Sequence, residues 1–387
     1  MIKTVLLLGS FALAGIASSF ATPQLTLNYN RPAEEWVEAL PVGNGRLGAM
    51  VFGNPGQERL QLNDVTIWSS GPQADTDRPE AYKNLPEIRR LLAEGNYKAA
   101  SDLTAATMTG ARGNFDWAYS GSYQTLGDLR FDHALPSGEP TAYRRWLDLD
   151  TAVAGVSFQL DGATYTRETF SSAPDRALVT RIASTRKQGV SFTLGLSRQH
   201  SASTTALGSD TLVMTGNTDY KHNNRNGLEK GNVDYQVRVR IVAKGGTVSP
   251  EGDRLVVKDA DEALVILACA TSYALDYQAN YRGPAPEPIV TQQLAAAAAK
   301  PYDRLRADHI ADYQKFFHRV TLDLGSTDAA QAPTDERLKA FQNGEDDPSL
   351  AALFFQFGRY LLISSSRPDN PLPSNSQGIW GDGFDLP

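Results

Sequence analysis

The sequence predicts a mainly β protein, an antiparallel β-sandwich with one helical insertion, followed by helices. Three observations predict this class. Short segments of alternating polar and apolar residues, separated by Gly, Asn and Asp turns, recur from residue 25 to about residue 277. One helical pattern interrupts them after residue 85. Beyond residue 283 the alternation largely stops, and apolar residues recur at helical spacing.

The first strong strand signal is a β-hairpin. Two apolar runs, Leu47 to Phe52 and Leu60 to Leu62, flank the turn Gly53-Asn54-Pro55-Gly56. Asn-Pro-Gly supplies the fixed φ and the positive φ that a tight reversal needs. Further strands are predicted at residues 25–29, 129–132, 156–160, 164–170, 190–196, 233–242, 255–257 and 263–273.

The helical insertion starts at Pro86, and Gly95-Asn96 is expected to break it into two helices. Pro284 to Pro288 predicts a stiff linker. Helices are then expected at Thr291 to Lys300 and from Pro301 onward, and Val320 to Leu324 reads as a lone strand. Residues 326–347 read as polar loop or short helix.

Asp347-Pro348 combines a cap with a first-turn proline, which predicts a helix from Pro348 to Ser365. This helix is apolar on nearly every side, so it is expected to be buried among other helices. The chain nevertheless ends at Pro387, soon after it. We therefore interpret the sequence as the N-terminal portion of a longer protein.

Composition excludes some classes of partner. The chain has 387 residues and a net charge of −7, with no basic stripe along it, so nucleic acid is not expected. Cys269 is the one cysteine and lies in a predicted buried strand. A single cysteine forms neither an internal disulfide nor a metal cluster.

Met1 to Ala21 has the pattern of a signal peptide. Lys3 gives the positive start, Val5 to Ile16 is apolar, and Ser19-Phe20-Ala21 provides small residues for cleavage. The apolar run is too short for a stable anchor, and no later stretch is long enough to span a membrane. The mature protein is expected to be periplasmic or secreted.

Several catalytic motifs are absent or misleading in the sequence. Gly43 to Gly48 matches G-x-G-x-x-G, but a strand-like run follows where a dinucleotide site needs a helix. The five histidines have no metal-ligand spacing, and no G-x-S-x-G occurs. Asp382 and Asp385 lie beside Trp380, where they face either a sugar or solvent.

Taken together, the motifs resemble glycoside hydrolase family 95, which includes α-L-fucosidases and some enzymes acting on L-galactosides. The matching segments cover nearly the whole mature chain in family order, and they are WVEALPVGNGRLGAMVFG, LQLNDVTIWSSGP, YQTLGDLRF, LDLDTAVAGVSF, YTRETFSS, HIADYQKFFHRVTLDL, FGRYLLISSSRP and SNSQGIWGD. The family usually has Asn-Leu-Gln-Gly-Ile-Trp-Asn where this chain has Asn375 to Gly381. Because of this departure, the resemblance does not assign the residues at the rim of the pocket.

The resemblance implies a β-sandwich at 22–283, linker helices at 284–325, and the start of an (α/α)6 catalytic barrel at 326–387, incomplete in this chain. It also implies inverting hydrolysis without cofactor or metal. The family uses a glutamic acid as the acid and an asparagine, polarised by an aspartate, to activate water. These residues lie downstream of the Gln-Gly-Ile-Trp segment, so no catalytic residue is assigned here.

Four residues are predicted to lie near the sugar, because Trp and amide side chains suit its apolar face and its hydroxyls. They are Asn63, Trp68, Gln377 and Trp380. The competing interpretation is interdomain packing. The predicted function is hydrolysis of terminal α-L-fucosyl or α-L-galactosyl residues of a fucosylated oligosaccharide or polysaccharide. The alternative is a non-catalytic sandwich that binds a carbohydrate or partner. Linkage, sugar preference and oligomeric state stay open.

Overall fold

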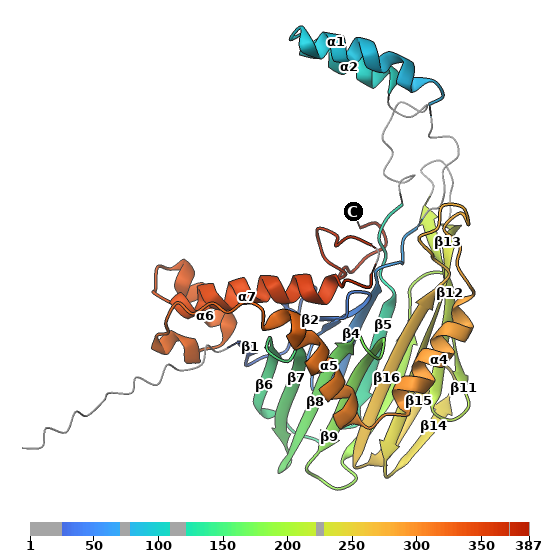
Figure 1. The fold of residues 1–387 in the computed structure, drawn as a ribbon. Helices are drawn as coiled ribbons and strands as arrows, with labels where there is room; N and C mark the ends of the chain where they lie inside the picture. The colour runs from blue at the N-terminus through green and yellow to red at the C-terminus, as the bar shows by residue number, and fades with distance from the viewer. Residues whose placement is uncertain (1–24, 70–77, 109–120, 222–227, 371, 387) are drawn as a thin grey trace, which may run out of the picture.

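The structure is a computed structural model that describes residues 25–69, 78–108, 121–221, 228–370 and 372–386. Two antiparallel sheets face each other, and helices lie over the larger sheet and at one end of the sandwich (Figure 1). The predicted β-sandwich is confirmed. The predicted signal peptide, residues 1–21, falls outside the described residues.

The larger sheet has nine strands in the order β1-β6-β7-β8-β9-β16-β13-β12-β11. Their bounds are Thr26–Tyr29, Thr141–Asp148, Val153–Leu160, Ala163–Ser172, Ala177–Ser184, Glu262–Thr271, Leu228–Lys244, Thr211–Lys221 and Ala202–Leu207. The smaller sheet has seven strands in the order β14-β15-β10-β5-β4-β3-β2. Their bounds are Thr247–Glu251, Arg254–Ala260, Val190–Ser197, Gly127–His133, Gln57–Asp64, Leu47–Val51 and Leu40–Gly43.

The predicted hairpin is strands β3 and β4, in which Leu47 pairs with Asp64 and Val51 with Leu60. The Asn54 side chain closes the turn by accepting hydrogen bonds from the backbone N–H groups of Gly56 and Gln57, at 3.0 and 2.9 Å. An Asx turn of this kind fixes the register of the two strands. The hairpin was therefore predictable from local sequence.

Strand β16 is buried on both faces, which explains its unbroken apolar sequence. Val265 and Leu267 point into the core between the two sheets. Ile266 and Ala268 point to the other side, where they join a second apolar cluster with the helix α4. Each large side chain buried in this way contributes about 1.5–3 kcal/mol.

The helical insertion consists of α1 (Leu85–Ala93) and α2 (Tyr97–Thr107) after a short 3-10 turn, η2 (Ala81–Asn84). The predicted break at Gly95 is confirmed, because Gly95 adopts a φ of +76° between the two helices. A positive φ is readily available only to glycine.

Helix α4 (Pro286–Ala298) begins earlier than the sequence predicted. Residues 284–288 were expected to form a linker, but Pro286 and Pro288 form the first turn of the helix. A proline is tolerated there because a first-turn N–H has no helical partner. Helix α5 (Tyr302–Phe317) starts where expected and lies against the larger sheet, as Figure 1 shows.

The predicted lone strand at 320–324 is wrong, because these residues pair with no strand in the described structure. Their backbone is engaged differently. The carbonyl oxygen of Val320 accepts a hydrogen bond from Arg359 Nη1 at 3.0 Å, so a helix side chain replaces a strand partner. The segment then leads through η3 (Asp328–Gln331) into the short helix α6 (Thr334–Gln342).

Helix α7 (Pro348–Ser365) has the predicted bounds and cap. The Asp347 carboxylate accepts from the Leu350 N–H at 3.0 Å and pairs with Arg337 at 2.8 Å. One side of the helix packs on the sandwich, where Tyr360 donates a hydrogen bond to the carbonyl of Pro41. The opposite side is exposed, with Phe354 77% accessible. The helix is therefore buried on one side only.

Candidate functional site

The segment after α7 is hydrogen-bonded to the smaller sheet through Asn63. The Asn63 side chain donates to the carbonyl of Gly381 at 2.9 Å and accepts from the Gly381 N–H at 3.1 Å. Gln61 donates to the same carbonyl at 3.0 Å and to Asn63 Oδ1 at 2.9 Å. Both amides are fully buried. Together they clamp one peptide of the segment, which we call the terminal loop (residues 377–386).

Trp380 anchors the terminal loop beside this clamp. It is 5% exposed, and its indole N–H donates to the carbonyl of Val42 at 3.0 Å. Tyr123 completes the contact, because its hydroxyl donates to the carbonyl of Ile379 at 2.7 Å and its backbone pairs with Leu386. The terminal loop is thus attached to the sandwich by hydrogen bonds between buried polar groups.

The Gly-rich motif at 43–48 makes room for this loop. A Cβ placed on Gly48 would lie 2.7 Å from Ile379 Cδ1, and one on Gly43 would lie 2.5 Å from the carbonyl oxygen of Ser364. Both separations are shorter than van der Waals contact, so the close approach requires glycine. The motif leads into strand β3, as predicted, and its glycines serve packing.

The four predicted sugar-facing residues therefore have different surroundings. Asn63 and Trp380 are buried, with their polar atoms used inside the protein. Gln377 is half-buried at the start of the terminal loop. Trp68 is half-buried and borders an open cleft. The structure brings Asn63 and Trp380 together through Gly381, and contact of any of the four with a sugar stays a prediction.

The cleft beside Trp68 has a volume of about 360 Å³ and is lined mainly by apolar and aromatic groups. The rings of Tyr273 and Tyr281 lie parallel, 6.3 Å apart and inclined by 3°. Asn375 also borders the cleft, and its Nδ2 is buried without a hydrogen-bond partner among the described residues. Aromatic faces with one unpaired amide donor suit the apolar face and hydroxyls of a sugar.

The two tyrosines and Asn375 were not singled out from the sequence. Tyr273 follows strand β16, and the turn that continues from it brings Tyr281 back alongside, with Tyr273 bridged to Arg282. A run such as Tyr273 to Tyr281 carries no periodic signal, so only the folded turn reveals the pairing.

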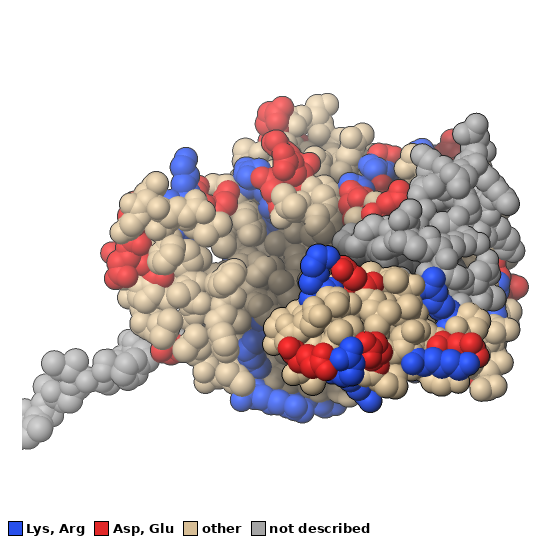
Figure 2. All heavy atoms as spheres, turned by 90° about the horizontal axis from the view of Figure 1, so that it is seen from above, with Lys and Arg blue, Asp and Glu red and all other residues tan. Residues whose placement is uncertain are grey.

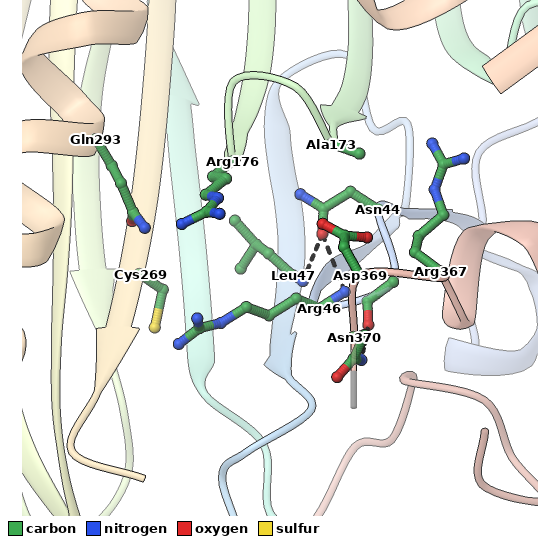
Figure 3. Close-up of a pocket in the computed structure, with 11 residues that line it drawn as sticks. Asn44, Arg46, Leu47, Ala173, Arg176, Cys269, Gln293, Arg367, Asp369 and Asn370 are labelled. Carbon is green, nitrogen blue, oxygen red and sulfur yellow. Dashed lines mark hydrogen bonds between the residues drawn. The ribbon is translucent and has the colours of Figure 1, made fainter. Parts of the chain in front are cut away.

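A second, smaller cavity of about 150 Å³ lies between the turn at 44–47, the turn at 173–176, helix α4 and the segment at 367–370 (Figure 3). We call it the arginine pocket, because Arg46, Arg176 and Arg367 are among its lining residues. This pocket was not predicted from the sequence, because its parts are far apart along the chain.

Other candidate groups have structural roles. Asp382 pairs with Arg59 at 3.1 Å, so this carboxylate of the terminal loop serves an ion pair within the protein. His309 is buried, stacks on Phe170 and contacts the carbonyl of Ala152 at 3.2 Å. Burial lowers the pKa of His309 to about 4. Across the described ranges, no group of three or more His, Cys, Asp or Glu side chains is arranged to hold a metal.

The last two features are the distribution of charge on one face and the apolar character of the helices. In the described part of the face shown in Figure 2, acidic and basic side chains are interspersed, and the middle of the face is hollowed. No helix in the described part of the chain has the length and apolar character needed to cross a membrane.

Comparison with known proteins defines the class. The model of the glycosyl hydrolase family 65 N-terminal domain matches residues 27–276. The model of the glycosyl hydrolase family 95 catalytic domain matches residues 301–387. The fold and these matches describe a chain in which a β-sandwich similar to the family 65 N-terminal domain precedes helices similar to part of the family 95 catalytic domain. The family 65 N-terminal domain match spans more than half of the chain, so the chain belongs with the proteins that carry this domain. Residues 301–387 are similar to the family 95 catalytic domain.

Two sequence relatives are named as fucosidases. The chain is 34% identical over 386 residues to Alpha-L-fucosidase 2 of Arabidopsis thaliana, covering 92% of this chain and 44% of that protein. It is 31% identical over 371 residues to Probable alpha-fucosidase A of Aspergillus niger, covering 89% and 43%. The chain thus spans less than half the length of these relatives.

One solved structure has a similar fold. It is named "Putative kojibiose phosphorylase from human microbiome", and it aligns with a TM-score of 0.51 at 10% identity. The alignment covers 93% of this chain and 44% of that one. At this level of identity the likeness concerns the fold alone.

Proposed function

We propose that the protein is a glycoside hydrolase of the α-L-fucosidase type. Its substrate is a fucosylated oligosaccharide or polysaccharide, from which it removes terminal α-L-fucosyl, or α-L-galactosyl, residues with inversion. The observation that carries this proposal is the 34% identity to Alpha-L-fucosidase 2 over 92% of this chain. The family 95 match at 301–387 supports it independently.

Inverting hydrolysis requires a general acid and a group that activates water on the opposite side of the sugar. The described residues that line the cleft beside Trp68, which we call the aromatic cleft, include no Asp or Glu. In the arginine pocket Asp369 is the one carboxylate among the lining residues described. We therefore place the acid and the water-activating group in a part of the catalytic barrel outside residues 1–387. Hydrolysis at these groups needs no cofactor.

In this proposal the described residues hold the terminal loop in place and orient the sugar. The clamp of Asn63 and Gln61 fixes the terminal loop on the sandwich, and with it the end of the chain segment that matches the catalytic domain. Trp68, Tyr273 and Tyr281 give the aromatic cleft a surface for the sugar's apolar face. The sandwich then acts as a rigid support for the site, while chemistry is supplied from the barrel.

The proposal includes the chain's processing and division. Residues 1–21 are removed on export, and the mature protein is periplasmic or secreted. The sandwich comprises residues 22–283, the linker helices 284–325, and the barrel begins at 326.

A second function is favoured by one observation. The aromatic cleft has an unpaired buried amide at Asn375 and no carboxylate among its described lining residues, which suits binding without hydrolysis. The alternative is therefore a non-catalytic sandwich that binds a carbohydrate. Both functions use the same cleft, and activity separates them.

The test uses the product of the complete reading frame that contains these residues. We expect release of L-fucose from 4-nitrophenyl α-L-fucoside, with β-L-fucose as the first anomer seen by proton NMR. N-terminal sequencing of the exported protein should begin at Thr22. Trp68→Ala should raise KM more than it lowers kcat, whereas Tyr82→Ala, at an exposed position outside the cleft, should change neither.

When residues 1–387 are expressed alone, their hydrolysis of the fucoside should be below detection. Loss of the general acid by itself lowers the rate by about two to four orders of magnitude. Turnover by this portion would contradict the placement of the catalytic groups. Binding of fucosylated glycans without any turnover by the complete protein would favour the non-catalytic alternative.

A further inference from the structure

The arginine pocket has a rigid polar wall. Asn44 holds the turn that forms it, since its side chain donates to the carbonyl of Ser172 at 3.1 Å and accepts from the N–H of Leu47 at 2.8 Å. Asn370 closes the same side by donating to the carbonyl of Gly45 at 2.7 Å. These amides are used within the protein, so they shape the cavity and leave recognition to its other side chains (Figure 3).

Arg176 extends toward the cavity, as Figure 3 shows. Its guanidinium makes no hydrogen bond or ion pair with any described residue, while the neighbouring Asp175 is paired with Lys300 at 2.6 Å. Arg176 also has a φ of +51°, in a turn closed by its N–H to the carbonyl of Ala173. A bulky residue in this conformation is strained, and such strain is concentrated at functional positions.

Arg46 extends from the facing turn in Figure 3. Its Nε donates to the buried carboxylate of Asp64 at 3.1 Å, which fixes the side chain. The terminal nitrogens of Arg46 have no hydrogen-bond partner among the described residues. Arg176 and Arg46 thus line the pocket with unused guanidinium donors, and Arg367, although paired with Asp312, also has a buried Nε and Nη1 without a partner among the described residues. Planar pairs of such donors match the two oxygens of a carboxylate.

Gln293 and Asp369 line the same pocket and offer acceptors, while the third lining arginine, Arg367, pairs with Asp312 at 2.6 Å. The Oε1 of Gln293 is buried without a partner in the described structure. Asp369, labelled in Figure 3, has an exposed carboxylate that makes no hydrogen bond or ion pair with any described residue. Carboxylate and amide oxygens accept hydrogen bonds from hydroxyl groups but repel a bare anion. The pocket therefore offers donors for a carboxylate and acceptors for hydroxyls.

We propose that the arginine pocket binds a uronic acid residue, with its carboxylate on Arg176 and Arg46 and its hydroxyls on Gln293 and Asp369. The cavity of about 150 Å³ corresponds to about five waters' share of liquid volume, enough for a carboxylate and part of one sugar ring. The statement that this uronic acid is part of an acidic glycan rests on the proposed function. The binding of a hydroxylated carboxylate in the pocket does not depend on that function.

The test is binding of D-galacturonic acid to the full chain, measured by isothermal titration calorimetry and by saturation-transfer NMR at low salt. D-Galactose lacks the carboxylate, and acetate lacks the hydroxyls. We expect galacturonic acid to bind about ten- to hundredfold more tightly than galactose, the worth of charge-assisted hydrogen bonds. It should also bind more tightly than acetate.

The informative variant is Arg176→Gly. Glycine accepts a φ of +51° without strain, so this variant should melt no lower than the parent chain while losing the ten- to hundredfold preference for galacturonic acid. Arg176→Lys keeps the charge and should retain only part of the preference. Gln188→Gly is the matched control, because it relieves a similar φ of +56° away from the pocket and should bind like the parent.

Three results would overturn the proposal. These are equal affinity for galacturonic acid and galactose, equal affinity for galacturonic acid and acetate, and unchanged binding by Arg176→Gly. Because none of these measurements depends on hydrolysis, a protein without fucosidase activity that binds galacturonic acid through Arg176 would refute the proposed function and still support this site.

Discussion

The clamp on Gly381 predicts the effect of removing Asn63. Asn63→Ala leaves the buried Gly381 N–H without an acceptor, while Gln61 still serves the Gly381 carbonyl. An unpaired buried polar group costs about 1–3 kcal/mol, and the small cavity left by truncation adds to this. We therefore expect the terminal loop to open about 2–4 kcal/mol more easily than in the parent chain.

Hydrogen exchange followed by mass spectrometry measures this directly. In the regime where reclosing is faster than exchange, that free energy corresponds to about 30- to 1000-fold faster exchange in peptides covering residues 377–386. Peptides from the remote strand β13 should exchange at the parent rate. Asn63→Leu keeps most of the volume, so it isolates the hydrogen-bond part of the effect.

Gln159→Ala is the matched control, because it truncates an amide at an exposed position of strand β7. It should leave exchange in 377–386 unchanged. If Asn63→Ala also leaves that exchange unchanged while the protein stays folded, the clamp does not hold the loop, and the reasoning from Asn63 to Gly381 is wrong.

Two further predictions concern packing and pH. Gly43→Ala should destabilise the protein by about 1–3 kcal/mol in urea unfolding, because its Cβ would meet the Ser364 carbonyl at 2.5 Å; Gly56→Ala, with its nearest contact at 3.9 Å, should be close to neutral, and equal effects would refute the packing argument. Burial lowers the pKa of His309 to about 4, so on acidification the unfolded state takes up a proton before the folded state does. The stability that the buried neutral ring contributes is complete above the ordinary pKa of 6.5, and it is lost as the pH falls toward 4. His309→Phe should remove up to about 3 kcal/mol of this acid sensitivity, measured as urea midpoints between pH 7 and pH 4, and an unchanged pH profile would contradict it.

The elements predicted correctly from sequence are those with local signals. The turn at Asn54 and the cap at Asp347 each fix a boundary through hydrogen bonds within a few residues, and the structure contains both. The errors at Pro286 and at 320–324 have the opposite origin. In each, the outcome depends on what the rest of the fold offers, a helix start over the sheet or a side chain from Arg359.

The candidate site was predictable only in part. Trp68 does border a cleft, but Asn63 and Trp380 are buried, because the terminal loop folds back over 300 residues of sequence onto the smaller sheet. Residue type suggested affinity for sugars in all four predicted residues. Whether a Trp or Asn faces a ligand or the protein's own backbone is decided by tertiary pairing, which the sequence pattern does not contain.

The two-sided burial of strand β16 has a consequence for how this architecture is inherited. A β-sandwich whose outer face is solvated can fold without a neighbouring domain, and it can be joined to other domains at its ends. Here Ile266 and Val179 look outward onto Val290 and Leu294 of helix α4, so a chain cut at residue 283 would expose them at about 1.5–3 kcal/mol each. A sandwich transferred to another protein is therefore expected to keep its stability only when helix α4 is transferred with it, with the joint placed after that helix.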